Sequence, residues 1–574
     1  MDNVAWAKIL VKELIHQKVR YFCVAPGMRS TPLIKAIDEH PLAQLMTHFD
    51  ERGVGFHALG FAKATGMPVA IVTTSGTALG NIMPAVMEAY HDEIPLIVLS
   101  GDRPPELQDC GANQTTNQVN FFGQHVKQSD EIPCPTKTLS PQYLQQKCHH
   151  AIQKALSSPQ GPVHLNCHYR KPLVRKAGEE IELSPKRTYL PTQVIDKNSM
   201  QEIADELMRH EKGAIIVGRL PLSSETHLIT ELARKLGWPI FPDILSQCRS
   251  DEPQGIPHFE AIIENSSDLK RLVPTVILHL GKGYMSRTLL DFLAQNPPEK
   301  MFHVSHLRFD PAHIVTDHIK ANPLVFAENL SNLLKGAGPN SFTALWEDLN
   351  KTAAKSITSF FENKKSLSEM EVARLFSSHL GPYEGLFLSN SMPIRDFSYL
   401  YHHSKKAGPI FANRGLSGID GNIATAIGIA RALKKRTWAV IGDLAFLHDL
   451  NSLAQLKRDL PITFIVVNNG GGGIYSFRAT REHKEFSENV LACSHARDFR
   501  AVAEQFSLQH FKPKSCEEFQ EIALYGAPQD GPSIIEIETD REENYALHLE
   551  LKRFLKGFDK KLKTRTFATY GPQL

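Results

Sequence analysis

The sequence lacks the features that mark several classes of protein. Its eight cysteines are scattered and form no Cys-x-x-Cys pair, which argues against a zinc ribbon or a disulfide scaffold and fits a reducing cytoplasm. The formal net charge is only +2, so the chain as a whole has no strong positive electrostatic field that would attract nucleic acid. No apolar run is long enough to span a bilayer, and the start has no signal-peptide pattern. We expect a cytoplasmic protein with no nucleic-acid partner and no integral membrane segment.

Short runs rich in Val, Ile and Leu alternate with helical patterns along the chain. A chain of 574 residues suggests about three domains, since a domain commonly has roughly 100–200 residues. Most runs are continuously apolar, which is typical of parallel strands covered on both faces. The pattern predicts an α/β protein with three doubly wound parallel-sheet domains. The expected strands are Tyr21–Ala25, Val69–Thr73, Leu96–Ser100, Val163–Asn166, Ala214–Gly218, Val276–Gly281, Leu386–Ser389, Trp438–Gly442, Thr463–Asn468 and Ser533–Ile537.

Two polar stretches with proline or glycine interrupt this alternation. One lies around residues 170–200 and the other around residues 335–365. Such stretches are typical of linkers. We therefore expect an N-terminal domain over 1–180, a central domain over 190–340 and a C-terminal domain over 360–574.

Two neighbouring strand ends carry polar residues and glycines. One strand ends in Gly442-Asp443, and the next ends in Asn468-Asn469 followed by the four glycines 470–473. In a βαβ unit both ends reach the same edge of the sheet. Carboxylate, amide and carbonyl oxygens suit Mg²⁺, and the N-terminus of the helix expected over Leu447 to Leu456 would face a diphosphate. We call these two strand ends the clasp; together they predict a metal and diphosphate site, although an ordinary turn would explain either end alone.

The clasp resembles the fingerprint of thiamine-diphosphate enzymes, which is Gly-Asp-Gly, a helix and Asn-Asn. The resemblance implies that Asp443, Asn469 and the backbone carbonyl of Gly471 hold Mg²⁺ or Mn²⁺. The positions that it implies for binding thiamine diphosphate are Glu51, Ser391, Gly442, Asp443, Leu444, Ala445, Asn469, Ile474 and Tyr475.

Further motifs narrow the resemblance to one family of these enzymes. They include residues 25–32 (APGMRSTP), 50–52 (DER), 102–107 (DRPPEL), 111–115 (GANQT), 390–391 (NS) and 413–421 (NRGLSGIDG). In this order they resemble the 2-succinyl-5-enolpyruvyl-6-hydroxy-3-cyclohexene-1-carboxylate synthase family, along the whole chain but most densely in its first and last thirds.

The resemblance implies a transferase of menaquinone biosynthesis, which decarboxylates 2-oxoglutarate and adds the four-carbon unit to isochorismate. It also implies a homodimer, possibly a tetramer, with active sites between subunits. The N-terminal domain would then bind the pyrimidine of the cofactor, and the C-terminal domain would bind the diphosphate.

The resemblance makes Glu51 the catalytic acid that hydrogen-bonds the pyrimidine N1′ of the cofactor. From the residues alone, an acidic residue favoured by a helix N-terminus is an equally good explanation. Both substrates are dicarboxylates, which require paired cations when buried, and arginine binds carboxylates bidentately. The substrate-binding positions that the family implies are Arg29, Arg103, Asn113, Gln114, Arg287, Ser391, Arg395 and Arg414.

Some positions depart from the family pattern. Leu444 replaces a glycine, and Met28 and Ala445 replace residues that usually carry a hydroxyl. Arg287 stands in a segment that often carries lysine, and Arg478 stands where an apolar residue is common. These changes leave two alternatives: a related decarboxylase or carboligase with another acceptor, and a non-catalytic binding protein. Ile474 and Tyr475 could also be plain core residues.

Overall fold

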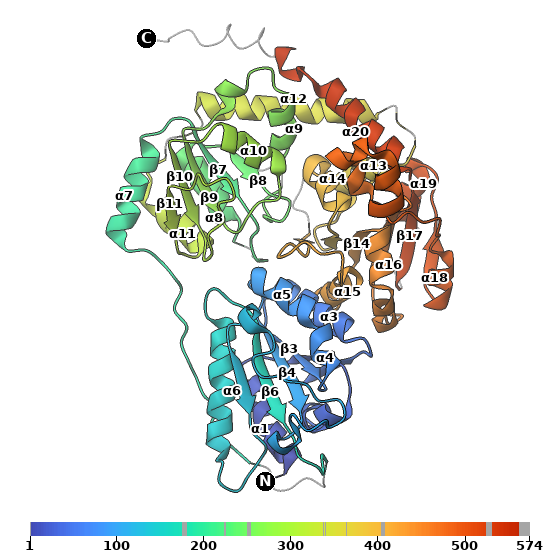
Figure 1. The fold of residues 1–574 in the computed structure, drawn as a ribbon. Helices are drawn as coiled ribbons and strands as arrows, with labels where there is room; N and C mark the ends of the chain where they lie inside the picture. The colour runs from blue at the N-terminus through green and yellow to red at the C-terminus, as the bar shows by residue number, and fades with distance from the viewer. Residues whose placement is uncertain are drawn as a thin grey trace.

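The computed structural model describes residues 2–561 except 175–180, 223–224, 250–253, 337, 339, 363, 365, 403–407 and 524–530. Three parallel sheets flanked by helices form its framework (Figure 1). The predicted fold class, with three doubly wound parallel-sheet domains, is confirmed. The predicted boundary at residue 180 lies outside the described residues, and the domain limits stay predictions.

The N-terminal sheet has its strands in the order β2-β1-β3-β4-β6-β5. They are β1 (Tyr21–Val24), β2 (Gln44–Thr47), β3 (Val69–Thr73), β4 (Leu96–Asp102), β5 (Ser129–Ile132) and β6 (Val163–His168). The helices are α1 (Asn3–His16), α2 (Thr31–Asp38), α3 (Glu51–Thr65), α4 (Thr77–Asn81), α5 (Met83–His91) and α6 (Pro141–Leu156), with a 3-10 turn η1 at Met28–Ser30. β3 and β4 are buried along their whole length, as their apolar runs predict.

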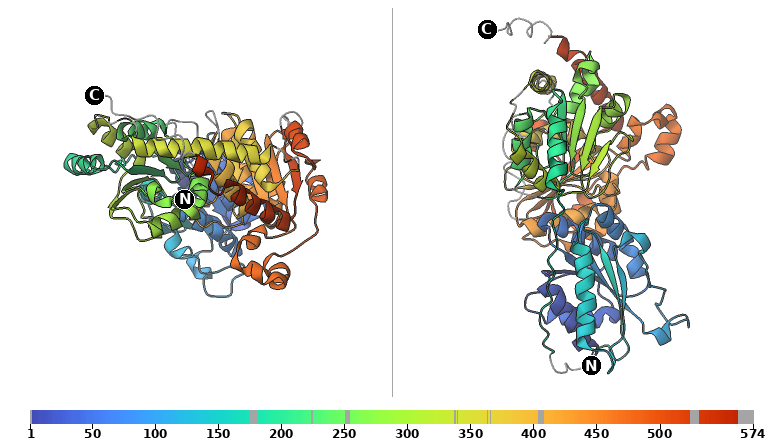
Figure 2. Two further views of the ribbon diagram at one scale, coloured as in Figure 1. Left: turned by 90° about the horizontal axis from the view of Figure 1, so that it is seen from above. Right: turned by 90° about the vertical axis from the view of Figure 1, so that its left-hand side faces the viewer.

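The central sheet has the order β11-β10-β9-β7-β8. Its strands are β7 (Gly213–Val217), β8 (Ile240–Pro242), β9 (Val276–Leu280), β10 (Lys300–Val304) and β11 (Asp317–Ile319). Its helices are α7 (Lys197–Met208), α8 (His227–Leu236), α9 (Phe259–Asn265), α10 (Arg287–Gln295) and α11 (Pro323–Leu333). The long helix α12 (Ser341–Phe361) then crosses toward the C-terminal domain and contacts α9 and α20 (Figure 2). No helix in the described part of the chain is long and apolar enough to cross a membrane.

The C-terminal sheet has the order β13-β12-β14-β15-β17-β16. Its strands are β12 (Gly385–Leu388), β13 (Ile410–Phe411), β14 (Thr437–Gly442), β15 (Ile462–Asn468), β16 (Gln509–Phe511) and β17 (Ser533–Glu538). Its helices are α13 (Glu369–His379), α14 (Met392–Leu400), α15 (Asn422–Leu433), α16 (Asp443–His448), α17 (Lys484–Phe486), α18 (Arg500–Gln505), α19 (Cys516–Glu521) and α20 (Arg541–Leu555), with 3-10 turns η5 (Leu450–Gln455) and η6 (Gly473–Phe477). With β12 counted as the first strand, this order is the same as that of the N-terminal sheet.

Every strand predicted from the sequence is present, with ends shifted by at most two residues. The strands that the sequence did not predict are β2, β5, β8, β10, β11, β13 and β16. Except for β10, all of them lie at a sheet edge, and they are short. β10 lies inside its sheet, but its apolar run is interrupted by Lys300 and His303.

The helix predicted after Asp443 is divided into two shorter elements. α16 ends at His448, and the 3-10 turn η5 follows from Leu450. The buried carboxylate of Asp449 between them accepts hydrogen bonds from Ser452 Oγ at 2.8 Å and from the Ala424 N–H at 2.9 Å. Because these bonds replace helical ones, the side chain of Asp449 divides the helix.

α3 of the N-terminal domain and α15 of the C-terminal domain cross in close contact (Figure 1). Each follows the strand at the equivalent edge of its sheet, β2 or β13. A Cβ atom on Gly60 would lie 2.1 Å from the carbonyl oxygen of Thr425, and one on Gly428 would lie 2.2 Å from that of His57. The two backbones therefore touch where only glycine fits.

Three histidines stack across the central sheet. His279, His303 and His318 are register partners on β9, β10 and β11. Their ring centroids are 4.4 Å apart for the first pair and 5.4 Å apart for the second. Burial lowers the pKa of all three, that of His303 to about 4. The folded domain therefore favours neutral rings.

The helix crossing gives a stability prediction. Gly60→Ala is expected to lower the free energy of unfolding by about 1–3 kcal/mol, because the added methyl group overlaps the α15 backbone. Gly80→Ala in α4 is the matched control, since the nearest atom to its new Cβ would be 4.0 Å away. Denaturant unfolding of both variants measures the difference, and equal stability of the two would contradict the close crossing.

The histidine stack gives a pH prediction. A histidine in the unfolded chain titrates near pH 6.5, but His303 in the folded chain titrates near pH 4. Between these values the unfolded chain binds a proton that the folded chain does not, so stability falls as the pH falls through this window. His303→Gln should reduce the loss of thermal stability between pH 6.5 and pH 4.5, whereas His150→Gln on the exposed surface of α6 should not. An unchanged pH dependence of stability in His303→Gln would refute the lowered pKa of His303 as its cause.

Candidate functional site

The clasp lies at the carboxyl edge of the C-terminal sheet, as predicted. β14 and β15 are paired in parallel up to the last residue of β14, so the two strand ends lie side by side. Asp443 is 2% exposed. Its Oδ1 accepts a hydrogen bond from the Leu444 N–H at 2.6 Å, and its Oδ2 accepts one from the Gly471 N–H at 2.9 Å. The carboxylate is thus held between the two halves of the clasp, and burial raises its pKa.

Asn469 presents an oxygen without a partner. Its Nδ2 donates to Glu369 Oε1 at 2.9 Å, while its buried Oδ1 has no hydrogen-bond partner within the described residues. The carbonyl of Gly471 accepts one bond, from the Gly473 N–H at 2.9 Å, and keeps a second lone pair. A carboxylate, an orphaned amide oxygen and a backbone carbonyl are hard oxygen donors of the kind that Mg²⁺ binds. The residues of the clasp therefore fit the metal that the resemblance implies.

Gly471 has a backbone that other residues could not adopt easily. Its φ is +147°, and an added Cβ would lie 2.6 Å from the carbonyl oxygen of Ala492. The glycine run of the sequence thus has a steric reason here.

Ser391 lies close to the clasp in the topology. It follows β12, the neighbour of β14, and the chain reverses its strand order between these two strands. Ligands of doubly wound sheets bind at such a switch point. The φ of Ser391 is +72°, an uncommon value for a residue other than glycine that is frequent at functional sites. Leu444 and Ala445 lie in the first turn of α16, which begins at Asp443 after the N-cap residue Gly442.

Ile474 and Tyr475 lie in η6, just after the glycines of the clasp. Both side chains are half-buried. Neither belongs to the apolar core clusters found among the described residues. The alternative of plain core packing is therefore not supported, and their role beside the cofactor stays a prediction.

Arg29 and Arg103 lie together at the carboxyl edge of the N-terminal sheet. Arg29 is 6% exposed and Arg103 is 9% exposed. Burial lowers the pKa of both, and the charge of Arg103 lowers that of Arg29 further. Arg103 donates to Ser75 Oγ, and the backbone carbonyl of Ser75 accepts from Gln114 Nε2 at 3.0 Å. Three of the predicted substrate-binding residues are thus adjacent.

Arg395 and Arg414 form a second cationic pair, at the carboxyl edge of the C-terminal sheet. Arg414 donates to Asn390 Oδ1 at 2.8 Å, and Arg395 donates to the backbone carbonyl of Ser391. Burial and the charge of Arg395 lower the pKa of Arg414 to about 10. Burial and the charge of Arg478 lower that of Arg395. Arg478, which departs from the family pattern, therefore adds positive charge to this pair.

The other two predicted substrate contacts are not joined to these pairs by any interaction among the described residues. Arg287 is 78% exposed in its side chain and pairs with Asp291 on the same helix at 2.8 Å. Asn113 is exposed beside Gln114. The structure brings together Arg29, Arg103 and Gln114, and separately Arg395, Arg414 and Ser391.

Glu51 is the first residue of α3. The side chain of Asp50 caps this helix by accepting from the N–H groups of Arg52 and Gly53. Glu51 Oε2 accepts a hydrogen bond from Asn81 Nδ2 at 3.0 Å. Within the described chain, no hydrogen bond or ion pair joins Glu51 to the clasp. Glu51 and the clasp are therefore separate groups among the described residues of one chain.

Comparisons with known proteins identify the family of the three domains. Three family models match in order: the N-terminal TPP-binding domain of thiamine pyrophosphate enzymes over residues 5–128, their middle domain over 183–388, and their C-terminal TPP-binding domain over 396–537. The 2-succinyl-5-enolpyruvyl-6-hydroxy-3-cyclohexene-1-carboxylate synthase of Rubrobacter xylanophilus is 37% identical over 97% of this chain and 99% of its own. The synthases of Salinibacter ruber and Chlorobium phaeovibrioides are 35% and 36% identical, over 95% and 96% of this chain and 95% and 97% of their own.

The chain belongs to this synthase family. It is a thiamine-diphosphate-dependent transferase. The two alternatives left open by the sequence, another acceptor and a non-catalytic descendant, are not favoured by these matches.

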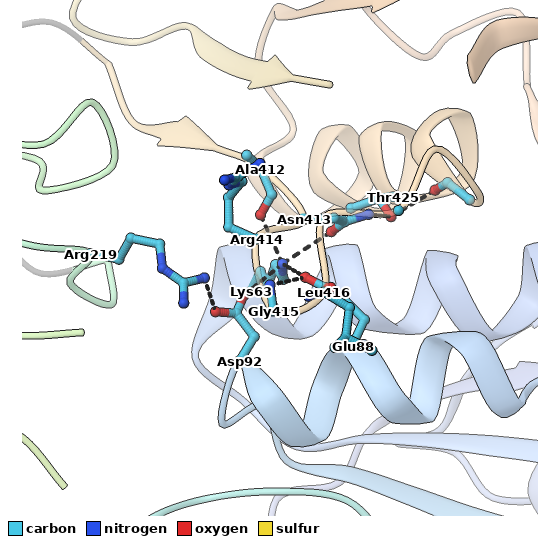
Figure 3. A network of polar contacts seen from close by, with 12 residues as sticks. Lys63, Glu88, Asp92, Arg219, Ala412, Asn413, Arg414, Gly415, Leu416 and Thr425 are labelled. Carbon is cyan, nitrogen blue, oxygen red and sulfur yellow. Dashed lines mark hydrogen bonds and ion pairs between the residues drawn. The ribbon is translucent and has the colours of Figure 1, made fainter. Parts of the chain in front are cut away.

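In this synthase-family chain, the N-terminal domain holds the loop that presents Arg414 (Figure 3). Glu88 of α5 accepts hydrogen bonds from the N–H groups of Gly415 at 2.7 Å and Leu416 at 2.6 Å. Lys63 of α3 donates to the carbonyl of Ala412 at 2.8 Å and to Asn413 Oδ1 at 3.0 Å. The loop is therefore fixed on both sides of Arg414 by charged residues of another domain.

The same lysine joins all three domains. Lys63 Nζ lies 2.7 Å from a carboxylate oxygen of Asp92, and Arg219 of the central domain lies 2.6 Å from the other oxygen (Figure 3). Burial would raise the pKa of Asp92, but Lys63, Arg219 and Lys282 outweigh it and hold the pKa well below its usual value. This buried ion network fixes the central domain against the other two.

Sequence reasoning missed several residues that touch the site. Lys63 and Glu88 lie within helices, and Glu369 and His495 lie far from the clasp in sequence. His495 Nε2 is 3.3 Å from Asp443 Oδ2. None of them belongs to a motif of fixed spacing, so only the three-dimensional arrangement reveals them.

The loop contacts give a prediction for the family reaction. Glu88→Gln should loosen the Arg414 loop, because an amide oxygen replaces two charge-assisted acceptors. Since small misplacements of a positioning group cost up to about 100-fold in rate, we expect kcat/KM to fall about 10- to 100-fold while cofactor binding stays unchanged. Glu39→Gln, which removes a carboxylate from a surface ion pair with Lys8 and Lys35, is the control and should have no effect. Steady-state kinetics decide, and wild-type kinetics in Glu88→Gln would contradict the positioning role.

Proposed function

We propose that this enzyme decarboxylates 2-oxoglutarate and adds the four-carbon unit to isochorismate, forming 2-succinyl-5-enolpyruvyl-6-hydroxy-3-cyclohexene-1-carboxylate for menaquinone biosynthesis. The observation that supports it most is the presence of two separate pairs of arginines, the buried Arg29 with Arg103 and the half-buried Arg395 with Arg414. Each pair lies at the carboxyl edge of a sheet. Each substrate has two carboxylates, and buried carboxylates require such cations. The names of the matched relatives give the same product.

The metal and the cofactor would be held by the clasp. Asp443, Asn469 and the carbonyl of Gly471 would bind Mg²⁺ or Mn²⁺, because their oxygens are hard donors. Ser391, Leu444, Ala445, Ile474 and Tyr475, which lie in the segments that follow β12, β14 and β15, would contact thiamine diphosphate. When bound, this cofactor supplies the electron sink for the decarboxylation, and the protein supplies orientation and electrostatics.

Glu51 would be the catalytic acid. Its carboxyl would hold a proton at the pyrimidine N1′ of the cofactor, and Asn81 would orient the carboxyl through the bond to Oε2. Gln114 and Asn113 would add neutral hydrogen bonds to a substrate. Arg287 is assigned to the substrate only by the resemblance, and its ion pair with Asp291 favours a surface role.

The active site would be completed by a second subunit in a homodimer. Among the described residues no hydrogen bond or ion pair joins Glu51 to the clasp, and in the proposed homodimer a partner's clasp would face Glu51. Apolar side chains next to predicted site residues are unusually exposed: Met28 is 75% exposed beside Arg29, and Phe49 is 68% exposed near Glu51. A partner that covered them would remove this apolar surface from water. The same proposal allows a tetramer made of two such dimers.

A cytoplasmic location is part of the proposal. The two exposed cysteines, Cys110 and Cys493, are free thiols. Free exposed thiols persist in a reducing compartment.

A product assay tests the proposed function. The enzyme with thiamine diphosphate, Mg²⁺, 2-oxoglutarate and isochorismate should release CO₂ and form the succinylated cyclohexene product, which mass spectrometry identifies. Glu51→Gln should keep cofactor binding but lose about 100- to 10,000-fold in turnover, the usual contribution of a positioned acid–base group. No product from isochorismate, with turnover of another acceptor, would refute the assignment, and full activity of Glu51→Gln would refute the role of Glu51.

A further inference from the structure

The side-chain amide of Asn469 can point either end at the metal position. Its oxygen is an acceptor and a metal ligand, whereas its NH₂ group is a donor and cannot bind a cation. Rotating the amide by half a turn exchanges the two with little change in shape. A site that depends on Asn469 therefore needs a neighbour that fixes which end faces the metal.

Glu369 is that neighbour. It is the first residue of α13, where Ser368 caps the helix, and it is 4% exposed. Its Oε1 accepts from Asn469 Nδ2 at 2.9 Å and from Thr539 Oγ1 at 3.2 Å. Asn469 directly follows β15 and Thr539 directly follows β17, so the ends of two paired strands hold the Glu369 carboxyl in place.

The direction of the bond follows from the second donor. Because Thr539 also donates to Oε1, this oxygen acts as an acceptor whether or not Glu369 binds a proton on Oε2. An acceptor opposite Asn469 requires the NH₂ end of the amide. The buried Oδ1 of Asn469, without a partner within the described residues, is then left for the metal position.

The surroundings support a dedicated arrangement. A Cβ on Gly473 would lie 2.7 Å from Asn469 Nδ2, so only glycine leaves space for the amide. The preceding Asn468 donates its own amide to Glu536 Oε1 and to the carbonyl of Arg497, each at 2.8 Å. Each asparagine of the clasp thus has its own buried glutamate as acceptor.

We propose that Glu369 is a positioning residue for the metal: it fixes the amide of Asn469 so that Oδ1 faces the cation. This inference rests on the proposed function, in which Asn469 binds Mg²⁺. Glu369 acts through Asn469 and has no direct contact with the metal or the substrates. Partners of metal ligands of this kind typically change metal affinity 10- to 100-fold when they are removed.

Metal binding tests the proposal without reference to turnover. Mg²⁺ is titrated into the full-length enzyme with thiamine diphosphate, and binding is followed by calorimetry and by the rise in melting temperature. Glu369→Met removes the acceptor at similar size and should weaken Mg²⁺ binding at least about 10-fold. Glu369→Gln, whose amide can face Asn469 in either sense, should give a smaller loss. Glu371→Gln is the matched control: Glu371 is buried on the same helix but pairs with Arg374 at 2.6 Å, and its loss should leave Mg²⁺ affinity within about twofold.

A double-mutant cycle separates positioning from simple charge attraction. In an Asn469→Ala background, Glu369→Met should have no further effect on Mg²⁺ affinity, because the group through which it acts is gone. An equal loss in that background would overturn the positioning role and favour a long-range charge effect. Wild-type Mg²⁺ affinity in Glu369→Met would also overturn it.

Two further measurements keep the test decisive. If Glu369→Met does not fold, Glu369→Asp replaces it, since the shorter side chain withdraws the acceptor and should weaken Mg²⁺ binding in the same direction. The wild-type enzyme is measured first. Absence of Mg²⁺-dependent cofactor binding in the wild type would count against the proposed function, whereas normal wild-type binding with unchanged variants would count only against Glu369.

Discussion

The close crossing of α3 and α15 is the contact on which the rest of the arrangement depends. Gly60 and Gly428 bring the two backbones together, so the N-terminal and C-terminal sheets have one relative orientation. That orientation places α3 and α5 against the loop of Arg414, where Lys63 and Glu88 hold it. It also places Lys63 where Asp92 and Arg219 add the central domain. Lys63 lies on the same helix as Gly60, so the helix that makes the crossing also carries a member of the ion network.

The N-terminal and C-terminal domains use one topology twice. Their strand orders are the same when counted from β1 and from β12. As a result, the polar residues that follow equivalent strands lie at equivalent edges, with Arg103 after β4 and the asparagines of the clasp after β15. The two edges then carry different groups, because the N-terminal edge has the arginines Arg29 and Arg103, whereas the C-terminal edge has the oxygens of the clasp beside Arg395 and Arg414.

Local sequence patterns predicted much of the fold. The buried strands have continuous apolar runs, and the clasp has glycines and polar residues at strand ends, so both are visible in the sequence. The short edge strands β13 and β16 are not visible in the sequence, because their strand conformation depends on pairing with strands that are distant in sequence. Asp449 could not be predicted to divide the helix after Asp443, since its partner Ala424 lies on another helix.

The candidate site was predicted only where its residues lie in motifs. The adjacency of Arg29, Arg103 and Gln114 agrees with the motif-based prediction, whereas Arg287 lies exposed on α10. Glu369, Lys63 and Glu88 act through neighbours that the fold brings to them, and no pattern of spacing encodes such contacts. Residues that act through a neighbour in this way are therefore found from the three-dimensional structure and not from the sequence alone.

α3 has a charged residue of the site near each end. Glu51 begins the helix and Lys63 lies twelve residues later, which corresponds to about 18 Å along a rigid helix at 1.5 Å per residue. A tilt of this helix that moved Glu51 would also move Lys63, which anchors the Arg414 loop. The positions of Glu51 and Lys63 are thus coupled through α3, and the contact of Gly60 with α15 lies between the two residues.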